Sequence, residues 1–139
     1  MTPERPQPRP PLGPRAAQVP VLDQDRLLRR FSGRRDIVLE LYQLFLEQLP
    51  GQRDQLQQAH QNGDMDDLFA KAHALKGACV TIAADICSSL AGQLNQAAQA
   101  RDAEAVDSLL LRLGAGLEDL RRALMRLCLH PPQTGPDQA

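Results

Sequence analysis

Aromatic residues are scarce in this chain of 139 residues, which has no tryptophan, one tyrosine and three phenylalanines. Its apolar residues are chiefly leucine and alanine, and this composition favours helix over sheet. The length is sufficient for one domain with a real core and too short for two ordinary domains. We therefore expect a single all-α domain.

Cysteine is also rare. The three cysteines, Cys79, Cys87 and Cys128, are odd in number and form no Cys-x-x-Cys pair. This pattern argues against a disulfide framework and against a structural zinc site. We interpret all three as small core residues.

Neither charge sign predominates, because 16 basic and 17 acidic residues give a formal net charge of -1. The arginines are interspersed with acids, which argues against a nucleic-acid partner. The chain has no apolar run of about 18 residues that could span a membrane and no charged-then-apolar leader. We expect no membrane partner and a cytoplasmic location.

Proline is nearly absent from the middle of the chain, where only Pro50 occurs among the eleven prolines. The others predict a disordered Pro-rich tail at 1–21, a folded domain at 22–129 and a second disordered tail at 130–139. For the N-terminal tail, a docking segment is the alternative interpretation.

Hydrophobic periodicity and capping residues predict five helices. They cover 24–31, 34 or 35 to 60, a segment from Asp64 that fades near 81–83, 84–100, and a segment that follows Asp102. The expected N-caps of the first, third and last of these helices are Asp23, Asp64 and Asp102. Pro50 should kink or break the second helix near Leu49, because proline removes a backbone donor and clashes one turn back. Four long amphipathic helices with short connections predict an antiparallel four-helix bundle, with the short first helix over one end.

The second helix carries two apolar strips. The main core face is expected to comprise Ile37, Val38, Leu41, Leu44, Phe45, Leu56 and Ala59. The displaced strip comprises Leu39, Tyr42, Leu46 and Leu49. We expect the first helix to cover this second strip through Leu27, Leu28 and Phe31, and the alternative is a partly open docking surface.

Spacing directs one histidine of the third helix away from the core. At about 100° per residue, one buried stripe is formed by Leu68, Ala72, Leu75, Cys79 and Ile82. His73 lies about 140° from this stripe, Lys76 about 80° and Gly77 about 180°. His73 should therefore be exposed, with Lys76 and Gly77 in the same outward sector.

The run His73-Ala74-Leu75-Lys76-Gly77-Ala78 resembles the His-x-Leu-Lys-Gly-(Ser/Ala) motif of histidine-containing phosphotransfer domains, the intermediates of multistep two-component phosphorelays. Upstream, Phe45-Leu46-Glu47-Gln48-Leu49-Pro50 resembles the family's Phe-Leu-x-x-x-Pro stretch, and Gly63-Asp64 resembles the turn before its histidine helix. The resemblance covers about 28–124.

Two positions depart from the family pattern. The turn after the histidine helix, often Leu-Gly-Ala, is Ile82-Ala83-Ala84 here, and without the glycine it is expected to be tighter or more helical. A glutamate often found near the end of the following helix is replaced by the uncharged run Gln93-Leu94-Asn95-Gln96.

The resemblance implies that His73 accepts a phosphoryl group from the phospho-aspartate of a hybrid sensor kinase receiver domain and relays it to the aspartate of a response regulator. Lys76 would stabilise the phosphoryl group and Gly77 would allow close approach. Phe69, Val80 and Leu46 are candidate docking residues. The chain would need no cofactor of its own, since Mg²⁺ would be supplied in the receiver domain. Histidine is a suitable nucleophile near pH 7 because its unperturbed pKa is about 6.5.

A non-catalytic helical-bundle adaptor or oligomerisation module would show the same stripes and is the alternative function. A di-iron bundle would need Glu-x-x-His pairs on facing helices, and a kinase would need a nucleotide-binding loop; the sequence has neither. We expect a phosphorelay intermediate without its own ATP-dependent kinase activity.

A monomer is expected because the apolar stripes of the four long helices can bury one another. A dimer through the last helix is the alternative.

Overall fold

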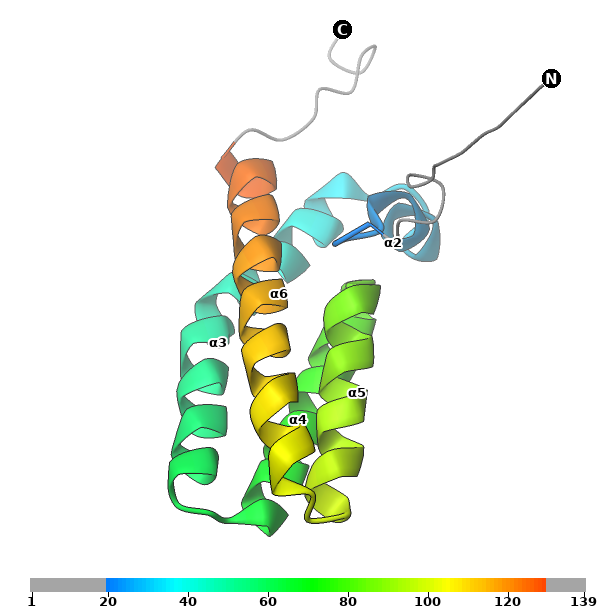
Figure 1. Ribbon diagram of the computed structural model, residues 1–139. Helices are drawn as coiled ribbons and strands as arrows, with labels where there is room; N and C mark the ends of the chain where they lie inside the picture. The colour runs from blue at the N-terminus through cyan, green and yellow to red at the C-terminus, as the bar shows by residue number, and fades with distance from the viewer. Residues whose placement is uncertain (1–19, 130–139) are drawn as a thin grey trace, which may run out of the picture.

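The computed structural model describes residues 20–129, and these residues form five helices and no strand. The helices are α2 (Gln24–Arg30), α3 (Arg35–Gln61), α4 (Met65–Thr81), α5 (Asp85–Gln99) and α6 (Ala103–Leu129) (Figure 1). The predicted all-α class is confirmed. The two predicted tails fall, except for residues 20 and 21, outside the described residues.

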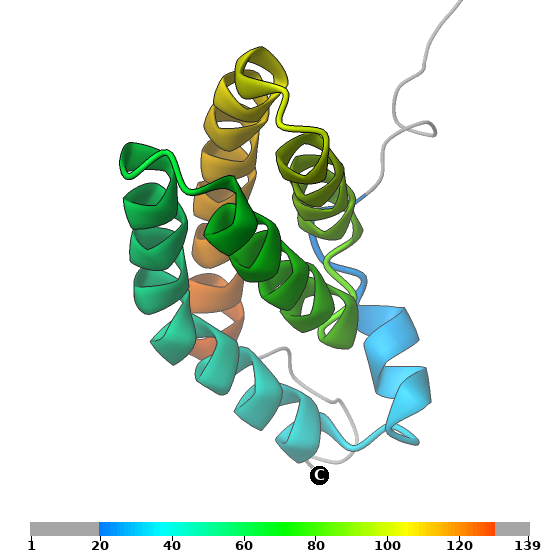
Figure 2. The ribbon, with the colours of Figure 1, turned by 90° about the horizontal axis from the view of Figure 1, so that it is seen from below.

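The four long helices alternate in direction and surround one core (Figures 1 and 2). α2 is the short additional helix, and it lies over one end of the bundle beside the turn between α4 and α5 (Figure 1). Within residues 20–129, no helix combines the length and hydrophobicity that a membrane crossing requires. The predicted bundle architecture is confirmed.

Aspartates begin three of the helices. Asp23, Asp64 and Asp102 each accept a hydrogen bond from the backbone N–H three residues later, at 3.0 to 3.1 Å. Such side-chain caps satisfy donors that the first helical turn leaves without a partner. The predicted N-caps are therefore confirmed.

α3 remains helical through Pro50 and changes direction near the middle of its length (Figure 2). A kink, one of the two predicted outcomes, thus occurs without a break. Pro50 is exposed, so its ring lies on the solvent side of the helix.

The predicted core face of α3 is partly wrong. Its buried residues are Val38, Tyr42, Phe45, Leu49, Leu56 and Ala59. Leu44 is 48% exposed, and Ile37 and Leu41 are only half-buried. Both strips are apolar, so periodicity alone did not decide between them. In the other strip Tyr42 and Leu49 are buried, whereas Leu39 and Leu46 are half-buried. α2 covers part of this strip through Leu28, which shares a small cavity with Leu39 and Tyr42.

The turn between α4 and α5 keeps a left-handed residue although it lacks glycine. Ala83 has a φ of 61° and is fully buried. The expectation of a tighter or more helical turn is therefore wrong, because Ala83 adopts the conformation that glycine takes at low cost. For a residue with a Cβ, this conformation costs about 1 to 2 kcal/mol.

Hydrogen bonds fasten α2 and the residue before it to this turn. The backbone N–H of Asp23 donates to the carbonyl oxygen of Ala83 at 3.0 Å. Arg26 donates to both carboxylate oxygens of Asp85 at 3.0 and 2.6 Å, which lowers the pKa of Asp85 below its ordinary value. Arg30 donates to the carbonyl oxygen of Thr81 at 3.0 Å. α2 thus closes the end of the bundle at the α4 C-terminus.

Replacing Ala83 with glycine should change the free energy of unfolding little, because relief of the left-handed strain offsets the loss of a buried methyl group and the added chain entropy. The control is Ala84→Gly, since Ala84 is equally buried but has a φ of -97°. We expect the control to be less stable than Ala83→Gly by about 1 to 2 kcal/mol in urea unfolding. Equal losses would show that the turn is unstrained.

Candidate functional site

The outer face of α4 carries five of the six predicted site residues. Phe69, His73, Gly77 and Val80 follow one another at helical spacing, with Lys76 beside Gly77. His73, Lys76, Gly77 and Val80 are exposed, and Phe69 is half-buried. The structure thus brings these five residues onto one surface.

The core holds α4 in this orientation. The predicted stripe is buried throughout and comprises Leu68, Ala72, Leu75, Cys79 and Ile82. Turning His73 inward would expose this stripe to water, at a cost of about 25 cal/mol per Å² of apolar surface. The direction of His73 is therefore fixed by the residues on the opposite side of its helix.

Small residues surround His73 and leave its imidazole open to solvent. Ala70, Ala74 and Gly77 lie three residues before, one after and four after it, and all are exposed. A Cβ added at Gly77 would meet nothing within 4 Å. The imidazole makes no hydrogen bond to any other residue in the range 20–129. The sequence analysis identified Gly77 but not Ala70 and Ala74. Their small size beside the histidine could have indicated an open surface around it.

Lys76 extends along the neighbouring helix. A Cβ added at Gly92 of α5 would lie 3.5, 3.6 and 3.7 Å from Cδ, Cε and Nζ of Lys76, so the lysine stem runs over this glycine. In the described part of the chain, Lys76 has no acidic partner within 4 Å, whereas Lys71 pairs with Asp67 at 3.0 Å. Lys76 is therefore the lysine whose charge is available to a ligand.

Asn95 joins α5 to α4 beside the histidine. Its side-chain amide donates to the carbonyl oxygen of Phe69 at 2.8 Å, and Phe69 lies one helical turn before His73. Sequence reasoning noted only that this part of α5 is uncharged. The missed signal was an amide residue flanking the buried stripe of α5, where it can reach the backbone of a neighbouring helix.

Leu46 lies apart from the other predicted site residues, on α3. It is half-buried and packs against the core. It lies four residues before Pro50, on the N-terminal side of the bend in α3 (Figure 2).

Comparison with known proteins identifies the family. The chain matches the Hpt domain family over residues 40–123. The crystal structure of histidine-containing phosphotransfer protein B from Pseudomonas aeruginosa PAO1 is similar, with a TM-score of 0.75 and 19% identity over 83% of this chain and 100% of that one. The HPT domain from a sensor hybrid histidine kinase from Shewanella gives a TM-score of 0.71 and 20% identity over 81% of this chain and 97% of that one.

Both structural similarities are at low identity and show the fold alone, and comparison with curated protein sequences gives no match. The family match, in contrast, spans more than half of the chain and includes all of α4 and α5. The chain therefore belongs to the Hpt domain family.

Proposed function

We propose that His73 accepts a phosphoryl group from the phospho-aspartate of a hybrid sensor kinase receiver domain and passes it to the aspartate of a response regulator. Membership in the Hpt domain family supports histidine phosphotransfer in a phosphorelay. The observation that carries the assignment to His73 is its open imidazole, exposed among small residues on the outer face of α4.

The reaction requires little from this chain beyond a positioned nucleophile. A lone pair on the neutral imidazole attacks phosphorus and forms a P–N bond, while the P–O bond to the aspartate breaks and the carboxylate leaves as an anion. No proton has to leave the neutral imidazole before the attack. Transfer to the second receiver reverses these bond changes, so His73 is regenerated.

Charge neutralisation is shared between the two proteins. Lys76 is one turn from His73 and has no acidic partner within the described residues, so its ammonium group can contact the phosphoryl oxygens as a point charge. In this proposal the receiver supplies Mg²⁺ and the acidic residues that hold it, and the chain uses no cofactor and no ATP of its own.

Docking uses the same face of α4. Val80 is 47% exposed and Phe69 is half-buried, so they place apolar surface on either side of His73 along the helix. Leu46, on the neighbouring helix α3, is the third candidate docking residue. A modest apolar area beside a charged group suits a transient interface. In this proposal the chain acts as a monomer, because the core residues of the four long helices are buried against one another. Leu111 of α6 remains 78% exposed.

Replacing His73 with glutamine should abolish the transfer of acid-labile, base-stable phosphate from a phosphorylated receiver domain. The matched control is His60→Gln, because His60 is also exposed but lies on α3 with Nε2 at 2.7 Å from Asp107. The control should be phosphorylated like the natural chain. Radiolabel transfer from purified receiver domains measures both variants.

Persistent phosphorylation of the His73→Gln variant would contradict the proposal. Binding of receivers without any transfer to the natural chain would favour the adaptor function instead. Circular dichroism and thermal melting establish that each variant is folded, and no large stability change is expected because both histidines are exposed.

Lys76→Gln should slow transfer on the order of 10-fold, which corresponds to the loss of one charge-assisted contact to the phosphoryl group. Lys71→Gln is the control, because it removes the only other lysine and a salt bridge outside the site. Equal rates for the two variants in rapid-quench measurements would show that Lys76 has no role in the transfer step.

Gly77→Ala should stabilise the fold and at the same time hinder the docking of a receiver domain. A methyl group at this position meets no atom of the described structure within 4 Å, and alanine favours a helix interior by about 1 kcal/mol over glycine. We therefore expect a higher melting temperature together with slower phosphotransfer. A variant that is more stable and transfers at the natural rate would rule out a close-approach role for Gly77.

A further inference from the structure

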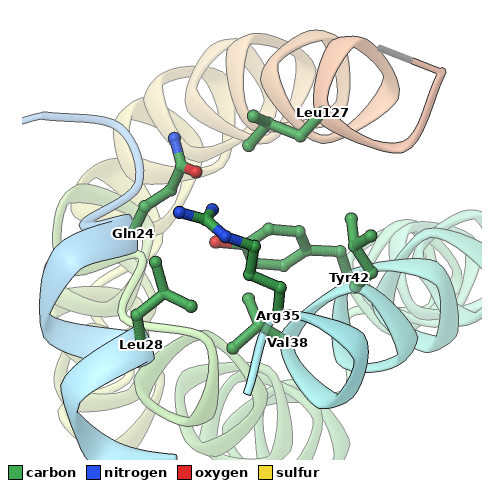
Figure 3. Close-up of a pocket in the computed structure, with 7 residues that line it drawn as sticks. Gln24, Leu28, Arg35, Val38, Tyr42 and Leu127 are labelled. Atoms are coloured by element: carbon green, nitrogen blue, oxygen red, sulfur yellow. The ribbon is translucent and has the colours of Figure 1, made fainter. Parts of the chain in front are cut away.

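A small cavity lies where α2, the first turns of α3 and the end of α6 meet, at the end of the bundle. Its volume is about 30 Å³, which accommodates a water molecule or the head of a small polar group. The residues that line it are Gln24, Leu28, Arg35, Val38, Leu39, Tyr42 and Leu127 (Figure 3). None of them is acidic.

The phenol of Tyr42 is buried beside this cavity without a partner. The residue is 1% exposed, and its hydroxyl makes no hydrogen bond to any group in residues 20–129. Buried hydroxyl groups in proteins are nearly always hydrogen-bonded. Burial raises the pKa of Tyr42 to about 12, so at neutral pH the hydroxyl keeps its proton and can donate it.

The side chain of Arg35 lines the same cavity as Tyr42. The side chains of Arg35, Tyr42 and Gln24 point toward one another (Figure 3). The structure gives Arg35 no salt bridge or hydrogen bond to another described side chain, whereas the adjacent Arg34 pairs with Asp36 at 2.9 Å. The residues that line the cavity thus include a cation and a hydroxyl donor and no acidic side chain. The charge of Asp23, which pairs with Arg26 at 3.8 Å, also reaches the phenol and raises the pKa of Tyr42.

We propose that this cavity binds a carboxylate group, with Arg35 and Tyr42 donating hydrogen bonds to its oxygens and Gln24 placed beside them. A guanidinium group matches the geometry of a carboxylate. The volume admits only the head group, so the remainder of a larger ligand would extend outside the cavity. Occupancy would link α2 to α3 and α6 at the end of the bundle.

The carboxylate can come from a free small acid or from Asp137 of the chain itself. Leu127 lines the cavity two residues before the end of α6, and Asp137 follows that end by eight residues. Eight residues can span up to about 26 Å, which makes this source sterically feasible. The chemistry of recognition is the same for both sources.

Tyrosine fluorescence tests the proposal directly, because Tyr42 is the only tyrosine and the chain has no tryptophan. The full chain is titrated with sodium formate, the smallest carboxylate, at constant ionic strength. A carboxylate that accepts a hydrogen bond from the phenol quenches its emission. The same titration is made with Arg35→Gln and with the control Arg34→Gln, each in the natural chain and in an Asp137→Asn background.

Saturable quenching that requires Arg35 but not Arg34, in both backgrounds, would support a site for a free carboxylate. If saturable quenching occurs only in the Asp137→Asn background, and the natural chain already has weak tyrosine emission before formate is added, then Asp137 is the occupant. If quenching increases linearly with formate and is the same in the natural chain and in Arg35→Gln, the proposal is wrong and the cavity holds only water. The melting temperature provides a second measure: formate should raise it for the Asp137→Asn chain but not when Tyr42→Phe is added.

Discussion

The packing of α4 against α5 is the contact on which the rest of the structure depends. Small residues line this contact, including the buried Ala72, Cys79, Cys87 and Ala91, and they allow the two helices to approach closely. Because the inner side of α4 must stay in the core, the residues on its outer side face solvent. The exposure of His73 is thus a consequence of core packing, without strain in the histidine itself.

The same contact arranges the groups around His73 and the end of the bundle. It places Gly92 beneath the stem of Lys76 and Asn95 within hydrogen-bond distance of the Phe69 carbonyl. It also leaves only three residues to connect the two helices, and Ala83 adopts a left-handed conformation within that turn. α2 binds this turn and covers the adjoining end of the core. The arrangement of groups around His73 and the left-handed turn at Ala83 therefore both follow from the packing of α4 against α5.

The sequence was sufficient to predict the helices, their aspartate caps and the outward direction of His73, because periodicity and capping are local properties. It was insufficient where two apolar strips compete on α3: Leu44 was assigned to the core and is exposed, while Tyr42 is buried. That choice depends on how α3 bends and on what α2 covers. The bond from Asn95 to Phe69 and the small cavity beside Tyr42 also join distant segments, so no local pattern indicated them.

The most direct measurement of the central claim is localisation of the phosphoryl group after transfer from a receiver domain, by phosphorus NMR and tandem mass spectrometry at alkaline pH. The account predicts a phosphoramidate on a ring nitrogen of His73, present at one group per chain and lost when an unphosphorylated second receiver is added. Phosphate on His60, on a carboxylate, or on His73 but not removable by any receiver would contradict the account.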